Sequence, residues 1–129
     1  MKPNELFIGA IVCAESPSGI CKVKEILSDC WIDANGIRHD YERTEPISLT
    51  PEILVKIGFE QDKDEFYLDI EHQWYIHFWN FKLTIWKDCS TYEYEDSKTV
   101  FEHTILVLNE LQNLFNILGI DKEIRLDSF

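Results

Sequence analysis

The 129-residue sequence lacks the short motifs that mark the common catalytic and metal-binding sites. It contains no GxSxG nucleophile motif, no GxxxxGK phosphate loop and no GxGxxG dinucleotide-binding motif. The four cysteines form no CxxC pair, and the four histidines form neither an HxH nor an HExxH pattern. We therefore expect no enzyme of a familiar class, no zinc site and no cofactor.

Long apolar runs and positive charge are also scarce. No run approaches the roughly 20 apolar residues that span a bilayer, and the N-terminal residues have no export signal, so we expect a cytoplasmic protein with reduced thiols that stays off membranes. The 24 acidic residues outnumber the 12 basic ones and give a net charge of −12. This charge repels phosphate backbones, so we expect no nucleic-acid binding and, if the acidic surface engages a protein, a basic partner.

Apolar and aromatic residues, by contrast, are plentiful. Hydrophobic residues make up 45% of the chain and include eight Phe, five Tyr and four Trp. This content is enough to build a core without disulfides. We expect one α+β domain over residues 1–129, with a strand-rich half at 1–48 and a second half at 49–129.

A short helix is predicted between the two halves, at residues 50–57. Thr50 can cap its N-terminus, Pro51 fits the first turn, and Gly58 can adopt the left-handed conformation that ends it. The charged residues 60–65 that follow are predicted to form a solvated connector.

The N-terminal half begins with a predicted hairpin. The Val- and Ile-rich segments 6–14 and 20–27 flank a turn at 15–19. Pairing that is symmetric about this turn places Cys13 opposite Cys21 on the core face, where both are expected to act as small buried residues.

A second hairpin is predicted over residues 30–41, where an Asn-Gly pair at 35–36 favours a two-residue turn. Its register places Asp33 opposite Arg38 on a solvent-exposed face and makes His39 a surface residue. Four short strands and a possible fifth predict a small SH3-like β-barrel; the alternative is an open, curved sheet covered by a later helix.

The chain after residue 65 alternates apolar and polar residues in three segments, which predicts an antiparallel β-meander: 66–70, 74–79 and 82–86. Aromatic residues occupy both faces of the middle strand. Tyr75, His77 and Trp79 share one face, which either is covered or forms an exposed surface that binds a partner. These three residues are the candidate binding site.

One long C-terminal helix is predicted at residues 99–118, packed across the meander. Thr99 and Glu102 match a capping box, and Gly119 supplies the stop. Leu108 lies in the apolar stripe of this helix, and Asn109 is expected on its surface.

Two stretches of the chain carry a resemblance. Residues 46–59 read PISLTPEILVKIGF and residues 111–114 read LQNL. They resemble the motifs PIPLTxEILxKxGF and LQNL of a group of small uncharacterised proteins common in Bacteroidetes genomes and in their prophages or mobile elements. Ser48 stands where the motif has its second proline. The group has no established activity, so the resemblance implies a fold and a source type only.

Three functions remain open on this sequence. A non-catalytic protein-binding module of prophage or mobile-element type needs only the acidic surface and the surplus aromatic residues. An acidic nucleic-acid mimic would use its carboxylates to occupy the basic groove of a host DNA-binding protein. An enzyme would need an unrecognised acid/base site, for which His77 with His72, Asp69 and Glu71 is the nearest group of residues.

Overall fold

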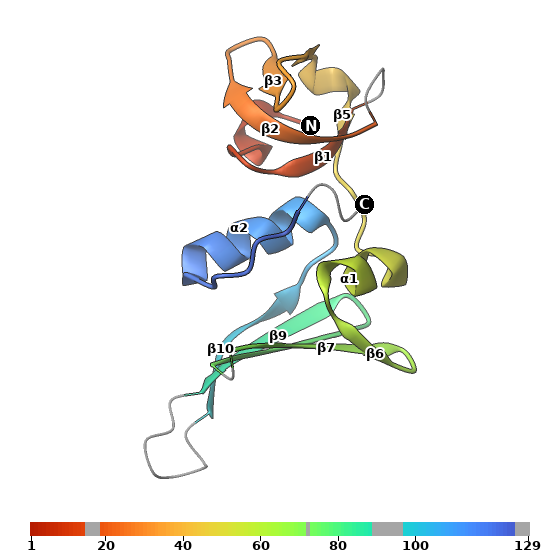
Figure 1. Cartoon of the computed structure of the whole chain (residues 1–129), viewed down its shortest axis with the longest axis vertical. Coiled ribbons are helices and arrows are strands. Elements are labelled where there is room, and N and C mark those ends of the chain that lie inside the picture. The colour runs from red at the N-terminus through yellow and green to blue at the C-terminus, as the bar shows by residue number, and fades with distance from the viewer. Residues whose placement is uncertain (15–18, 72, 89–96, 126–129) are drawn as a thin grey trace.

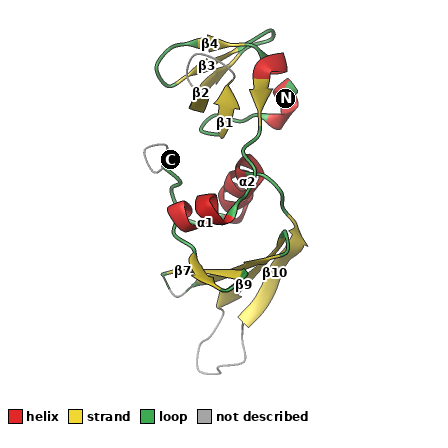
Figure 2. Ribbon diagram, turned by 90° about the vertical axis from the view of Figure 1, so that its right-hand side faces the viewer, coloured by secondary structure: helices red, strands yellow, loops and turns green. Residues whose placement is uncertain are grey.

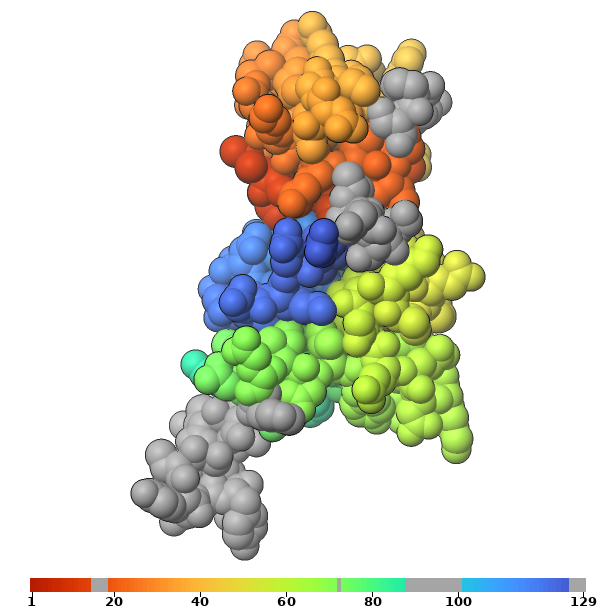
Figure 3. Space-filling view, viewed as in Figure 1, coloured from red at the N-terminus to blue at the C-terminus, as the bar shows by residue number. Residues whose placement is uncertain are grey.

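Two antiparallel sheets with two helices between them form the architecture of the computed structural model (Figure 1). The structure describes residues 1–14, 19–71, 73–88 and 97–125. The N-terminal sheet, the helices and the second sheet follow one another along the longest axis, as the space-filling view also shows (Figure 3). In the described residues, no helix is long and apolar enough to cross a membrane.

The first sheet has the strand order β4-β3-β2-β1-β5 and curls into half of a barrel (Figure 2). Its strands are β1 (Ile11–Ala14), β2 (Gly19–Ile26), β3 (Trp31–Asp33), β4 (Arg38–His39) and β5 (Thr44–Glu45). A short 3-10 turn at Pro3–Glu5 precedes β1, and another at Tyr41–Arg43 joins β4 to β5. The α+β class and the curved N-terminal sheet are as predicted. The two edge strands β4 and β5 are not paired with each other in the described residues, so the sheet order does not include barrel closure.

The register of the first hairpin differs by one residue from the prediction. Val12 pairs with Cys21 and Cys13 pairs with Ile20, because Ala14 pairs with a glycine that the prediction had placed in the turn. A shift of one residue turns every side chain of a strand to the opposite face. Cys21 is buried as predicted, but Cys13 faces the other side of β1 and is only half-buried, so the predicted Cys13–Cys21 pair is wrong.

The second hairpin is also shifted by one residue. The backbone turns through the three residues 34–36, so Arg38 pairs with Ile32 instead of Asp33. Asp33 and His39 consequently face the inside of the curled sheet and are buried. Their predicted place on a solvent-exposed face is wrong.

Helix α1 (Pro51–Ile57) matches its prediction at both ends. Thr50 Oγ1 accepts a hydrogen bond from the Ile53 N–H at 3.3 Å, and Gly58 ends the helix with a φ of +124°. A positive φ of this size strains residues with a Cβ, so glycine is the residue that suits the position. The predicted connector at 60–65 is largely exposed, as expected, but its first three residues form a short edge strand, because their backbone extends the hydrogen-bonded ladder of the next strand.

The second sheet contains the predicted meander and two further strands, in the order β10-β9-β8-β7-β6. Its strands are β6 (Glu60–Asp62), β7 (Glu65–Ile70), β8 (Trp74–Trp79), β9 (Lys82–Asp88) and β10 (Ser97–Thr104).

The long C-terminal helix is the largest error of the sequence prediction. Helix α2 spans only the 11 residues Leu108–Leu118, and the expected capping-box residues Thr99 and Glu102 lie in β10 instead. Residues 99–104 are rich in Thr, Val and Phe, which favour strands, and the pairing of β10 with β9 satisfies backbone groups that a free helix end would leave open. The C-terminal end was predicted correctly, since Gly119 adopts the left-handed conformation with a φ of +71°.

The hydrophobic core has two parts. The larger part fills the space between α1, α2 and the inner face of the second sheet; the smaller part lies inside the first sheet around Trp31. Helix α2 also contacts the first sheet. Ile11 of β1 packs in the larger core, which also contains the buried residues of α2. The Gln112 side chain accepts from the Ile11 N–H at 2.8 Å and donates to the Gly9 carbonyl at 3.1 Å. The helix layer thus joins the two sheets.

Candidate functional site

The predicted binding residues lie on the outer face of the second sheet, the face turned away from both helices (Figures 1 and 2). Within β8 the alternation is regular, with Trp79 exposed and with Tyr75 and His77 half-buried, while the residues between them are buried in the core. No described helix or strand covers this face. Its role in binding remains a prediction.

Neighbouring strands add two rings that the sequence analysis did not select. Tyr67 of β7 lies opposite His77 with ring centroids 5.0 Å apart, and Trp86 of β9 lies 6.3 Å from the same imidazole. We call Tyr67, Tyr75, His77, Trp79 and Trp86 the aromatic face. The alternation in β7 and β9 points to these two residues once the strand pairing is known, because side chains at paired positions share a face.

Carboxylates border the aromatic face. Glu65 Oε1 lies 3.0 Å from His77 Nε2, and Asp64 accepts a hydrogen bond from Trp79 Nε1 at 3.2 Å. A recess of about 320 Å³ is lined by Tyr67, Tyr75, Trp86, Glu60 and Asp69 together with backbone neighbours. These groups give the face both apolar surface and negative charge.

One tyrosine of the aromatic face responds to this environment. Burial, together with the nearby carboxylates of Glu65 and Asp62, raises the pKa of Tyr67 above its ordinary value. A phenol with the ordinary tyrosine pKa of about 10 is already protonated at neutral pH, so Tyr67 can donate a hydrogen bond there and the upward shift only adds to that margin.

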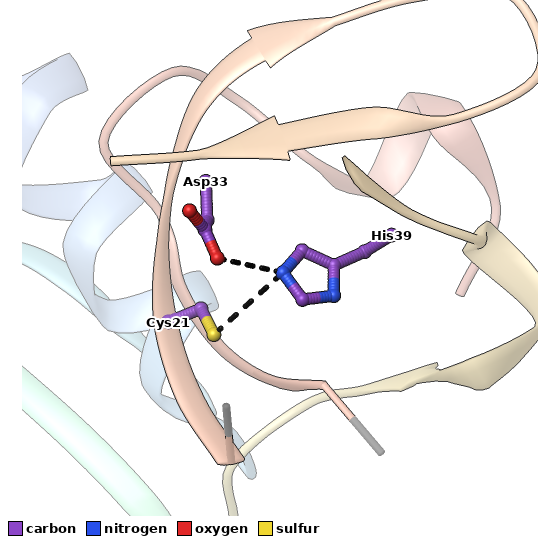
Figure 4. Close-up of side chains that lie close together, drawn as sticks. All are labelled: Cys21, Asp33 and His39. Carbon is purple, nitrogen blue, oxygen red and sulfur yellow. Dashed lines mark hydrogen bonds and ion pairs between the residues drawn. The ribbon is translucent and has the colours of Figure 1, made fainter. Parts of the chain in front are cut away.

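A second group of chemically active side chains lies inside the first sheet (Figure 4). Cys21 comes from β2, Asp33 from β3 and His39 from β4, and each is 2–6% exposed. His39 Nε2 lies 2.7 Å from Asp33 Oδ2 and 4.0 Å from Cys21 Sγ. The three donor atoms all lie within 4.8 Å of one another, and we call this group the buried cluster.

Local structure fixes the orientation of two members of the buried cluster. Asp33 Oδ1 accepts hydrogen bonds from the N–H groups of Asn35 at 2.8 Å and Ile37 at 3.0 Å, so its other oxygen points at His39. The Trp31 ring packs on the His39 imidazole with centroids 4.5 Å apart. The hairpin turn thus positions the carboxylate, and the core positions the imidazole.

Asp33 is ionised despite its burial. Burial raises its pKa, but the hydrogen bonds from His39, Ile37 and Asn35 act in the opposite direction and together hold the pKa of Asp33 below its ordinary value. The carboxylate is therefore the hydrogen-bond acceptor in its pair with His39, whose Nε2 carries the proton.

The geometry of the buried cluster differs from that of a nucleophile, base and carboxylate acting in series. A catalytic triad uses both ring nitrogens of its histidine, one for the nucleophile and one for the carboxylate. Here Cys21 and Asp33 both approach Nε2 (Figure 4). The cluster instead brings one sulfur, one nitrogen and one oxygen donor toward a common point, as metal-binding sites do.

The sequence contained little sign of this cluster. Its members lie 12 and 6 positions apart in the chain, so no short metal-binding motif links them. Cys21 was correctly predicted to lie on the core face, but the second hairpin prediction was one residue out of register and turned Asp33 and His39 toward solvent. A correct register would have placed all three side chains on one face.

The acid/base site considered around His77 can be followed only in part. His72 lies outside the described residues, and the described partner of His77 is Glu65 rather than Asp69 or Glu71.

Comparison with known proteins adds no further evidence about the site. No family model, no curated protein and no solved structure matches this chain.

We expect the contribution of Asp33 to stability to depend on pH. An unfolded aspartate has a pKa of about 3.9, and the folded value is lower. The stabilisation is therefore complete above the unfolded pKa and is lost as the pH falls through the folded pKa, because the unfolded chain binds the proton first. Urea unfolding of wild type and Asp33→Asn, at neutral pH and in steps below about pH 4, should show the two proteins converging in stability. A difference that stays constant over this range would contradict the prediction.

Proposed function

We propose that the protein is a non-catalytic binding module that holds a basic segment of a partner protein on the aromatic face. The observation that carries the proposal is a cluster of rings bordered by carboxylates on the outer face of the second sheet, where no described helix or strand covers them. Tyr67 and Trp79 are 43% and 45% exposed there, although both are large aromatic residues.

The rings supply contact area and a preference for cations. Exposed aromatic side chains gathered on one face are typical of interaction sites, and Tyr and Trp contribute strongly to binding energy. A guanidinium group stacks on such rings and is attracted by their negative faces. An arginine-containing segment therefore suits this face better than an acidic or purely apolar one.

The charges around the rings favour the same partner. The exposed or half-buried acidic residues on this face and its rim are Glu60, Asp62, Asp64, Glu65 and Asp69. Lys82 of β9, which lies opposite Trp79, is a basic residue close to these carboxylates, and its ammonium group is paired with the Glu102 carboxylate. The net charge of −12 adds long-range attraction for a basic partner.

The resemblance to prophage-type proteins supports a mobile-element origin as part of this proposal. A module from such an element needs only to occupy a surface of another protein. That requirement fits a chain in which no familiar catalytic motif occurs.

The test is binding of a fluorescent peptide of alternating Arg and Ser, followed by anisotropy. Trp79→Ala should weaken binding by about tenfold, which corresponds to about 1.4 kcal/mol and lies within the range of interface aromatic residues. Tyr67→Ala should act in the same direction. Ile8→Ala is the matched control, because Ile8 is an exposed apolar residue in the N-terminal half.

Two results would count against the proposal. Peptide binding that is unchanged in both ring variants would show attraction by charge alone, as a nucleic-acid mimic would give. An equal loss in Ile8→Ala would show that the effect does not arise at the aromatic face.

A further inference from the structure

We propose that Cys21, Asp33 and His39 bind one divalent transition-metal ion inside the first sheet, with Zn²⁺ as the best match to their donor atoms. This site is independent of the proposed function, since the aromatic face lies at the opposite end of the molecule from the first sheet (Figure 1). A metal here joins three neighbouring strands.

The distances between the donor atoms are close to those of a metal site. Tetrahedral Zn²⁺ with bonds of about 2.0–2.3 Å holds its donors about 3.3–3.6 Å apart. In the buried cluster the nitrogen–oxygen distance of 2.7 Å is shorter than this and the nitrogen–sulfur distance of 4.0 Å is longer. Adjustments on the order of 0.5 Å bring both into the range of a bound metal, and side-chain torsions alone can supply them.

The donor set also matches the charge of the ion. A thiolate and a carboxylate each contribute one negative charge, and a neutral imidazole contributes none, so a divalent cation makes the buried cluster neutral. Neutrality matters because an unbalanced charge in a core is costly. On binding, the Cys21 S–H bond breaks, the sulfur bonds to the metal, and the thiol proton leaves to solvent. The proton on His39 Nε2 is also lost while Nδ1 takes one up from solvent, so the imidazole stays neutral and the Nε2 lone pair becomes free to bind the metal.

Surrounding groups hold the donors in place, as second-shell residues do in metal sites. The N–H groups of Asn35 and Ile37 fix one oxygen of Asp33 and leave the other facing the cluster. Trp31 packs on His39 and is itself held by a hydrogen bond from its Nε1 to Thr44 Oγ1 at 2.8 Å. The binding geometry is therefore largely formed by the fold.

The number of protein donors is three. Within the described ranges, the group contains no fourth Cys, His, Asp or Glu donor. Three protein ligands leave one position of a tetrahedron for water.

The experiment uses the full chain, freed of metal and titrated with Co²⁺ in the presence of excess Mg²⁺. The magnesium occupies exposed carboxylates, which prefer hard cations. We expect saturation at one equivalent, a thiolate-to-cobalt charge-transfer band, the strong visible absorption of four-coordinate Co²⁺, and loss of these signals when Zn²⁺ is added. Cys21→Ala should remove the charge-transfer band.

Cys30→Ala is the matched control. Cys30 is also a buried thiol of the N-terminal half, but it is not part of the buried cluster. This variant should keep the full cobalt spectrum. A wild-type titration without the band at one equivalent, a band that persists in Cys21→Ala, or one that disappears in Cys30→Ala would each overturn the proposal.

A second measurement covers the case in which Cys21→Ala does not fold. Calorimetric titration of the wild-type protein with Zn²⁺, in buffers of different ionisation enthalpy, should show release of the thiol proton, and bound Zn²⁺ should raise the Tm. Heat without proton release, or an unchanged Tm at saturating Zn²⁺, would overturn the site without affecting the peptide-binding test.

Discussion

Leu108→Ala should lower the free energy of unfolding by about 2–5 kcal/mol, the usual cost of removing a large buried side chain. Leu108 is fully buried at the start of α2, in the core that this helix shares with the second sheet. The loss is a large part of a typical domain stability of about 5–15 kcal/mol. Chemical denaturation with two independent probes measures the change.

The matched control for this prediction is Ile117→Ala in the same helix. Ile117 is 71% exposed, so its replacement should change stability by about 0.5 kcal/mol or less. Equal losses for the two variants would mean that α2 is oriented differently. Asn109 cannot serve as the control, because its predicted surface position is wrong. It is buried, and its Nδ2 donates to the Glu5 carbonyl at 3.4 Å.

Asp33→Ala should cost about 3–5 kcal/mol, because it removes the acceptor of three hydrogen bonds and each unsatisfied buried donor costs about 1–3 kcal/mol. The substitution leaves His39 without its carboxylate and leaves the N–H groups of Asn35 and Ile37 without their acceptor. Unfolding in urea at neutral pH and without added metal gives the number.

A second aspartate near the same hairpin provides the comparison. Asp29 pairs with Arg38 at 3.3 Å, but its side chain is 73% exposed, and exposed pairs contribute little. Asp29→Ala should therefore be almost neutral. If Asp29→Ala lowers the free energy of unfolding as much as Asp33→Ala does, the hydrogen bonds of the buried cluster do not account for the loss.

The features that were predicted correctly depend on neighbouring residues in the chain. Thr50 and Gly58 determine the two ends of α1 through contacts within one helical turn. Gly119 determines the end of α2 in the same way. The apolar alternation of residues 66–86 was sufficient to predict the meander and to assign Tyr75, His77 and Trp79 to one face.

The features that were missed depend on residues far apart in the chain. The capping-box pattern at Thr99 and Glu102 involves only neighbouring residues. The hydrogen bonds that favour a strand at these positions come from β9, and the local pattern contains no information about them. The hairpin registers depend on the length of each turn, and one residue decides which side chains face inward. For this reason the aromatic face was found in part, while the buried cluster was not found.

The chain order of the two sheets has a consequence for synthesis on the ribosome. Each sheet is made from one continuous stretch, so β1 to β5 can pair as soon as residue 45 has left the exit tunnel. Ile11, however, is covered by a core that includes α2, and Gln112 is the side chain that bonds to its N–H. A nascent chain therefore exposes this face of the first sheet until α2 has been translated and has left the exit tunnel. This interval is the stage at which a chaperone has most to protect.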